Sequence, residues 1–113
     1  FSSGVFLALK SGLLLADAAD DPLRMGNVSA STFEDYGRKM QASIETMRKI
    51  VYAFYDEGFS FKDLVMQGEQ MRSDLTDCLV GNVDDRDFDD LFAAMSKLAD
   101  LPAPIEYGLA KAS

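Results

Sequence analysis

The sequence contains no histidine, no tryptophan and a single cysteine, Cys78. Without histidine, these 113 residues cannot form a serine-type catalytic triad or a histidine general base, and most zinc sites are excluded. Catalysis by this chain alone would therefore need carboxylates or a cofactor. A lone cysteine cannot close an internal disulfide, and its position among apolar residues predicts a buried thiol in a reducing compartment, which favours a cytoplasmic protein.

Basic residues and long apolar runs are also scarce. Lysine and arginine together number 11 against 19 aspartates and glutamates, so the net charge is -8. No basic stripe is available to neutralise phosphates, which excludes nucleic acid as a partner and argues against an anionic membrane surface. The apolar stretch from Val5 to Ala19 is too short to cross a bilayer and is interrupted by Lys10.

The residues that are present suffice for one small domain. Hydrophobic residues make up 48% of the chain and aromatic residues 11%, which is enough for a core. Apolar residues recur at helical spacing, and glycine and proline separate the segments, so we predict an all-α fold, a small bundle of about five helices. The expected helices cover about 4–19, 31–57, 60–66, 69–80 and 84–98.

The first expected helix is apolar on several sides, with Leu7, Leu9 and the run from Leu13 to Leu15 around it. A helix of this kind is normally buried. Small residues recur every four positions along it, at Gly4, Ala8, Gly12 and Ala16. Such a ridge lets another backbone approach closely, as when a helix lies on a sheet, yet nothing later in the chain predicts a sheet. We therefore expect the natural neighbour of this helix to lie outside the chain, and Pro22 to end the helix.

A connector over residues 23–30, with the turn dipeptide Gly26-Asn27, separates residues 1–22 from a helical domain of residues 31–113. At the start of that domain Ser31 and Glu34 match a capping box. The apolar seam that follows predicts an antiparallel partner helix, and Gly58 is expected to cap the C-terminal end. The seam consists of Phe33, Gly37, Met40, Ile44, Met47, Val51 and Phe54.

The later helices carry local signals of their own. Ser60 is expected to cap a short helix, and Gly81 is expected to end the next one, in which Met71, Leu75, Cys78 and Leu79 face inward. The cluster from Asp84 to Asp90 lacks the ligand spacing of a calcium loop, so we interpret it as the solvated start of the last helix. The apolar stripe of that helix is Phe88, Leu91, Phe92, Met95 and Leu98, and Ile105, Tyr107 and Leu109 in the tail are expected to pack on another surface.

Two segments are candidates for function. The aromatic residues Tyr52, Phe54, Tyr55 and Phe59 belong either to the core or to the wall of a substrate pocket or interface. The opening residues Ser2, Ser3 and Gly4 place free backbone N–H groups at a helix N-terminus, which is either an ordinary helix start or a place for an electron-rich group. A loop that runs straight into an apolar helix, with no leader or initiator methionine, is expected in the middle of a longer protein.

The opening residues resemble a known family. The stretch from Phe1 to Gly12, followed by Ala16-Asp17-Ala18, resembles the segment just after the glycine-aspartate flavin motif of FAD-dependent oxidoreductases of the flavin-dependent halogenase and monooxygenase-like family. The run from Val51 to Tyr55 with Phe59-Ser60-Phe61 is similar to a run in their helical C-terminal region. The resemblance implies that the chain is the C-terminal part of such an enzyme and that residues 1–22 belong to its FAD domain.

In that family this helix N-terminus faces the flavin and stabilises negative charge on the reduced ring. Carried onto this sequence, the backbone of Gly4 and Val5 takes that role beside Ser3. In halogenating members the matching pair of residues, which is Ser3-Gly4 here, also lies beside the halide. The resemblance further implies a small aromatic or other organic substrate, with Tyr52, Phe54, Tyr55 and Phe59 in the wall around it.

The chain also departs from the family. Phe1 stands where tryptophan halogenases carry a glutamate, and the dinucleotide-binding glycine fingerprint, the catalytic lysine and the tryptophan-bearing motif are missing. A phenol- or pyrrole-type relative or a non-halogenating oxidase fits better. The chain alone is expected to bind no FAD, to lack catalytic and metal-binding residues, and to need the missing N-terminal FAD-binding domain as its partner.

A second interpretation is an autonomous acidic helical module that binds a protein partner through its aromatic surface. The two interpretations differ over the first helix. An autonomous module should cover Leu7, Leu9 and Leu13 to Leu15 with its own residues. A part of a larger enzyme would leave much of that surface uncovered, or would hide it by self-association through the first helix.

Overall fold

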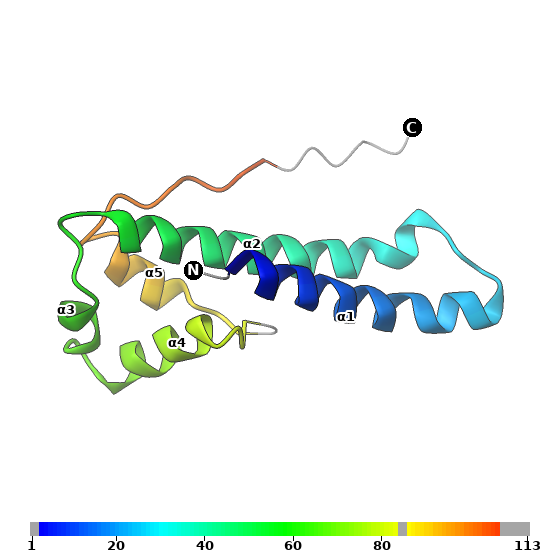
Figure 1. Cartoon of the computed structure of the whole chain (residues 1–113), viewed down its shortest axis with the longest axis horizontal. Helices are drawn as coiled ribbons and strands as arrows, with labels where there is room; N and C mark the ends of the chain where they lie inside the picture. The colour runs from blue at the N-terminus through cyan, green and yellow to red at the C-terminus, as the bar shows by residue number, and fades with distance from the viewer. Residues whose placement is uncertain (1–2, 84–85, 107–113) are drawn as a thin grey trace.

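The computed structural model describes residues 3–83 and 86–106, and all the secondary structure within these ranges is helical (Figure 1). The predicted all-α bundle of five helices is confirmed. The elements are α1 (Ser3–Met25), the 3₁₀-helix η1 (Ala30–Phe33), α2 (Glu34–Tyr55), α3 (Phe61–Val65), α4 (Glu69–Leu79) and α5 (Asp89–Met95).

Helices α1 and α2 form an antiparallel hairpin that sets the long dimension of the molecule, 52 Å (Figure 1). The first turns of α1 lie beside the middle and later part of α2, where Leu7 and Val51 line the same hollow. Farther along α1, Leu14 and Ala18 lie beside the N-terminal end of α2. A hydrogen bond of 2.7 Å between the hydroxyls of Ser11 and Tyr36 joins the two helices. The antiparallel partner that the α2 seam predicts is therefore α1.

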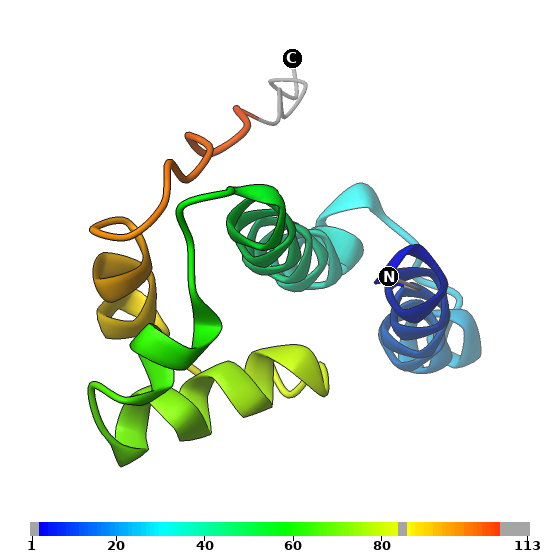
Figure 2. The ribbon, with the colours of Figure 1, turned by 60° about the vertical axis from the view of Figure 1, so that its left-hand side comes forward.

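A second group of helices, α3 to α5, packs against the C-terminal half of α2 and encloses the core (Figure 2). The core side chains with no exposed surface come from all four helices: Ile50, Ala53, Leu64, Cys78, Leu91 and Met95. As predicted, Phe88, Leu91 and Met95 of the last stripe are buried. Leu79 was predicted to face inward, and this is wrong, because it lies one position past Cys78 on α4 and is 49% exposed.

The predicted end of the first helix at Pro22 is also wrong. Helix α1 continues to Met25, so residues 23–25 of the expected connector are helical. Pro22 lacks an N–H and removes one intrahelical hydrogen bond, a loss that the last turns of a helix tolerate better than its middle. The helix ends instead at Gly26, which has a left-handed φ of 66°, and the Asn27 amide donates to the Pro22 carbonyl at 3.0 Å.

The ends of α2 differ from the sequence prediction as well. Ser31 does not cap α2, because it lies within η1, and its hydroxyl forms a hydrogen bond of 2.8 Å with the Ser29 hydroxyl. At the other end α2 stops at Tyr55, and Gly58 is not its cap, since the Asp56 carboxylate accepts the Gly58 amide at 2.8 Å. An Asx-type turn at Asp56 therefore ends the helix before the glycine is reached.

Two local predictions are confirmed. The Ser60 hydroxyl accepts from the Asp63 amide at 3.3 Å and caps α3. Gly81 follows α4 with a left-handed φ of 79°. The predicted span of the last helix is too long, because α5 begins only at Asp89 and ends at Met95, so that just Asp89 and Asp90 of the acidic cluster stand in its first turn. Of the residues that carried other predictions, Phe1, Ser2, Asp84, Asp85, Tyr107 and Leu109 lie outside the described part of the chain.

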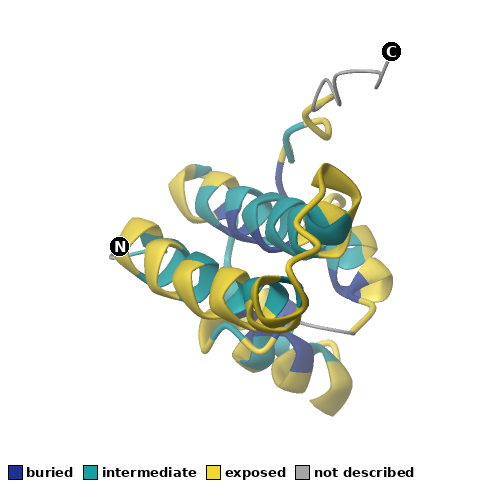
Figure 3. Ribbon diagram, turned by 90° about the vertical axis from the view of Figure 1, so that its right-hand side faces the viewer, coloured by how far each residue is buried: buried dark blue, intermediate teal, exposed yellow. Residues whose placement is uncertain are grey.

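Helix α1 has the sequence of a buried helix whose neighbour is expected outside the chain, and among the described residues it is not buried. None of its residues is buried, and Figure 3 shows its outer side exposed along its length. Val5, Leu9 and Leu13, spaced four residues apart, are 64%, 67% and 71% exposed. Only one flank of α1 meets α2, and Leu9 and Leu13 on the other side line a shallow hollow whose described lining comes from α1 alone.

A close approach between α1 and the end of α4 yields a testable difference between two glycines. The Lys10 ammonium donates to the Gly81 carbonyl at 3.2 Å, and a Cβ atom added at Gly81 would overlap the Phe6 ring. Gly26 has a similar left-handed φ but open space around it. Gly26→Ala is expected to lower the free energy of unfolding by about 1 kcal/mol, because alanine is strained in the left-handed backbone conformation. Gly81→Ala should cost about 2 kcal/mol, because the Phe6 ring must also turn aside.

Urea denaturation of both variants measures this difference. If both variants lose the same free energy of unfolding, the Phe6 ring does not pack against Gly81 in solution. The double variant Phe6→Ala with Gly81→Ala serves as the control, because without the ring the alanine at 81 should behave like the alanine at 26.

Candidate functional site

The candidate site lies at the N-terminal end of α1. Ser3 begins the helix, and Gly4 and Val5 follow in its first turn. The first N–H groups of a helix have no partner within it, and the helix dipole adds partial positive charge at this end. A Cβ added at Gly4 would meet no other atom within 4 Å, so the backbone there is open to close approach.

Ser3 opens onto a hollow of about 160 Å³ between α1 and α2. Arg48, Val51 and Tyr52 line its α2 side, and Leu7 lies beside Ser3 on α1. Two predicted site residues from distant parts of the sequence, Ser3 and Tyr52, are therefore brought together. The antiparallel register of the hairpin produces this arrangement, because it sets the start of α1 against residues 44–52 of α2.

A second hollow of about 390 Å³ continues along α2 toward its C-terminal end. Val51 and Tyr52 line both hollows, and Tyr55, Asp56 and Asp100 complete the second one. Tyr52 and Tyr55 are 53% and 72% exposed, so their rings form an open aromatic surface rather than part of the core.

Phe54 and Phe59 of the predicted aromatic wall do not line either hollow. The Phe59 ring packs edge-on against Phe61 with 4.7 Å between ring centroids, and it is half-buried against the core. Phe54 is half exposed and lies 6.2 Å from Phe61 and 5.3 Å from Tyr55, between centroids. The four aromatic residues thus divide into a surface pair, Tyr52 and Tyr55, and a pair that meets at Phe61.

Arg48 and Glu45 belong to the site although sequence reasoning did not single them out. One guanidinium nitrogen of Arg48 donates to both Glu45 carboxylate oxygens at 2.9 Å, and the guanidinium lies 5.7 Å from the centroid of the Tyr52 ring. The spacings from Glu45 to Arg48 to Tyr52 are three and four, which place all three on one helix face. That spacing is the signal from which the cluster could have been predicted.

Cys78 offers no reactive thiol. It has no exposed surface, and burial raises the pKa of the thiol from 9.0 to about 12, with a further contribution from the Asp74 carboxylate. The thiol is therefore protonated at neutral pH and serves as a core residue. Among the residues that the structure describes, no three acidic or cysteine side chains converge as metal ligands.

Comparisons of the chain with protein-family models, with curated proteins and with solved structures gave no match. Across the two described ranges, no helix has both the length and the apolarity that crossing a membrane requires.

Proposed function

We propose that this chain is the C-terminal helical part of an FAD-dependent oxidoreductase of the halogenase- or monooxygenase-like kind. In this proposal the backbone of Gly4 and Val5, beside Ser3, faces the edge of the flavin, and Ser3 and Gly4 also adjoin the halide if the enzyme halogenates. The missing FAD-binding domain covers the outer side of α1. The chain alone holds no FAD and is inactive.

The uncovered face of α1 carries this proposal. Val5, Leu9 and Leu13 present apolar side chains to solvent, and the small residues Gly4, Ala8, Gly12 and Ala16 are all exposed beside them. Exposed apolar surface on this scale marks an interaction site, and small residues permit close backbone approach. A domain with a flat sheet surface fits such a face better than a helix that meets only the leucines.

The residues at the start of α1 fit the edge of a flavin but not a whole dinucleotide. Open space at Gly4 and the first-turn N–H groups allow a flat, electron-rich ring edge to approach the backbone. Bound FAD would supply the redox chemistry. The chain itself would stabilise negative charge on the ring edge, and the hollow from Ser3 to Tyr52 would lead toward a small aromatic or other organic substrate.

A second candidate function is an autonomous acidic helical module that binds a protein partner. The observation that favours it is the closed core of α2 to α5, which needs no residue of α1 for its fully buried members. Such a module would use the exposed rings of Tyr52, Phe54 and Tyr55, or the α1 face, as its binding surface.

The reading frame upstream of the Phe1 codon separates the two functions. The enzyme requires a glycine-aspartate pair and a proline shortly before Phe1, and a GxGxxG fingerprint near the start of the polypeptide. An initiation codon directly before Phe1 would exclude the enzyme and leave the module.

The flavin contact itself is tested in the longer polypeptide that this reading frame defines. Gly4→Val places a branched side chain where the ring edge is proposed to lie, so FAD affinity should fall at least about tenfold. Gly37→Val is the matched control, because Gly37 lies on α2 and also has open space around it. Flavin titration followed by fluorescence measures both. Equal affinities of the two variants would contradict the placement of flavin at Gly4. Micromolar FAD binding by the 113-residue chain alone would contradict the separate proposal that this chain holds no FAD by itself.

A further inference from the structure

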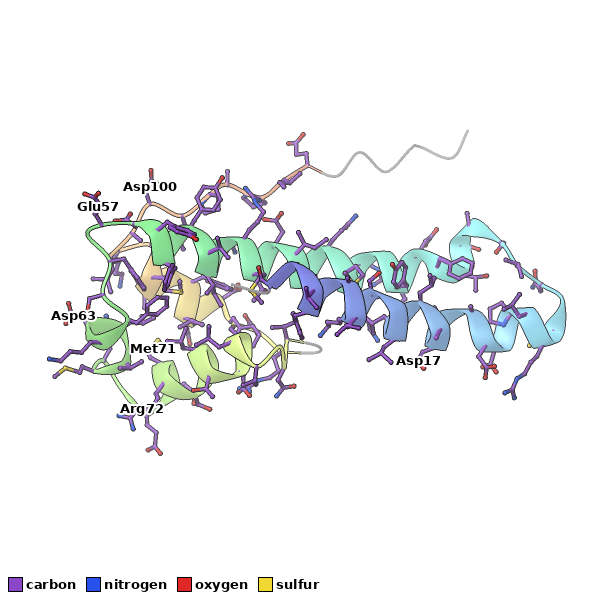
Figure 4. The ribbon with its side chains drawn as sticks, in the orientation of Figure 1. Asp17, Glu57, Asp63, Met71, Arg72 and Asp100 are labelled. Atoms are coloured by element: carbon purple, nitrogen blue, oxygen red, sulfur yellow. The ribbon has the colours of Figure 1, made fainter. Side chains whose placement is uncertain are left out.

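The larger hollow, of about 390 Å³, lies where the C-terminal end of α2 meets the segment that follows α5. Figure 4 labels Asp100 of that segment at this end of α2. The volume is at the lower end of the range of small-molecule sites, about 300–1,000 Å³, so a ligand that fits the hollow is small. Tyr52 and Tyr55 line the hollow and are more than half exposed, so a ligand reaches their rings without any movement of the chain.

Two carboxylates line this hollow, and no cation of the described residues neutralises them. The Asp56 carboxylate accepts the Gly58 amide at 2.8 Å and the Asp100 amide at 3.1 Å, and these two bonds fix its position. Within the described ranges neither Asp56 nor Asp100 forms a salt bridge, whereas Asp35 and Asp74 each do. The lining of the hollow therefore carries a net negative charge, which favours a positively charged ligand.

The aromatic rings of the hollow suit a cation as well. The Arg48 guanidinium lies 5.7 Å from the centroid of the Tyr52 ring, which is the distance of a cation–π contact. Its charge is compensated by Glu45, since it donates to both carboxylate oxygens at 2.9 Å, so Arg48 is not the counter-ion of the hollow. Tyr55 is 72% exposed, and no cation of the described residues lies over its ring. This ring is therefore available to a cation from outside the chain.

We propose that this hollow binds a small organic ammonium ion. The cationic group lies against the rings of Tyr52 and Tyr55, whose electron-rich faces attract it and whose apolar surface suits the methyl or methylene groups around its nitrogen. The carboxylates of Asp56 and Asp100 compensate its charge. The further statement that the organic substrate of the enzyme carries this ammonium group rests on the proposed function.

Titration of the 113-residue chain with choline, followed by the NMR signals of the backbone amides near the hollow, tests this site. The matched probe is the uncharged alcohol in which a carbon atom replaces the choline nitrogen, because it has the same shape without the charge. Choline should bind at least about fivefold more tightly than this alcohol. Tyr55→Leu should weaken choline binding about three- to fivefold, because it removes the open ring. Asp100→Asn should weaken it about two- to fivefold, because it removes one of the two charges.

Asp63→Asn is the control, because Asp63 is also an exposed aspartate but lies on α3 and lines neither hollow (Figure 4). It should bind choline as tightly as the parent chain. The ammonium site is overturned if choline binds no more tightly than the alcohol, if Tyr55→Leu has no effect, or if Asp100→Asn and Asp63→Asn have equal affinities. A short lysine peptide that binds more tightly than choline would make the ligand a protein side chain and overturn the small-molecule assignment. The titration needs no FAD, so failure of flavin binding at Gly4 and failure of choline binding are separate results.

Discussion

Leu91→Ala is expected to lower the free energy of unfolding by about 2–5 kcal/mol. Leu91 has no exposed surface and stands on α5 within the core that joins α2, α3 and α4. Alanine loses the transfer free energy of the removed carbons and leaves a cavity that the surrounding helices cannot fully close. For a chain of this size the loss is a large fraction of the total stability.

Leu13→Ala is the matched control for this change. Leu13 is also a helical leucine, but it is 71% exposed on α1, so the same truncation should change stability by less than about 0.5 kcal/mol. Urea denaturation followed by circular dichroism measures both variants, with unchanged m-values as the check that each unfolds cooperatively. A large loss for Leu13→Ala would mean that α1 is covered in solution, either by a second copy of the chain or by residues outside the described ranges.

This pair of substitutions also bears on function. If Leu91 supports the fold and Leu13 does not, the leucines on the outer side of α1 contribute little to stability within the chain. Large apolar residues at such positions are then explained by something that binds them. The FAD-binding domain is the partner we propose, and the autonomous module would require a protein partner at the same face.

Helix positions were predictable where the signal is local. The stripe of Phe88, Leu91 and Met95 follows from the period of the helix, and the Ser60 cap and the glycine after α4 depend on residues within three or four positions. Such features need no knowledge of what packs against them, which is why they are confirmed.

The errors occurred where two local signals competed. At the first helix Pro22 was expected to stop α1, but Gly26, four residues later, ends it, because a left-handed residue reverses the chain whereas one missing N–H does not. At the second helix Ser31 was assigned as a cap, but the residues before Glu34 form the 3₁₀ turn η1. Propensity alone does not decide between an α-helical start and a 3₁₀ turn at the same residues.

The candidate site could be predicted only in part. Ser3, Gly4 and Val5 were selected from the chemistry of a helix start, and Tyr52 from an aromatic cluster. That Ser3 and Tyr52 line one hollow depends on the register of α1 against α2, which packing sets and no sequence spacing encodes. The contact of Arg48 with Ala103 is equally nonlocal, since it joins residues 55 positions apart.

Arg86→Ala is expected to lower the free energy of unfolding by about 2–3 kcal/mol, an effect second only to that of Leu91→Ala. The Arg86 guanidinium bonds the Asp74 carboxylate at 3.2 Å and forms a second salt bridge with Asp77. Asp74 is only 5% exposed, so removal of Arg86 leaves a buried carboxylate with Gln70 as its remaining partner, at 2.8 Å. The same arginine ties the loop after α4 to the helix, and its guanidinium lies 5.5 Å from the centroid of the Phe88 ring.

Arg72→Ala is the control, because Arg72 is also on the α4 side of the molecule but projects outward (Figure 4). Its loss should change stability by less than about 0.5 kcal/mol. A double-mutant cycle with Asp74→Ala isolates the pair: the double variant should be more stable than the sum of the single losses predicts, because it leaves no buried charge without a partner. Additive losses, or a cost for Arg86→Ala no greater than that for Arg72→Ala, would show that this salt bridge does not hold the loop against α4.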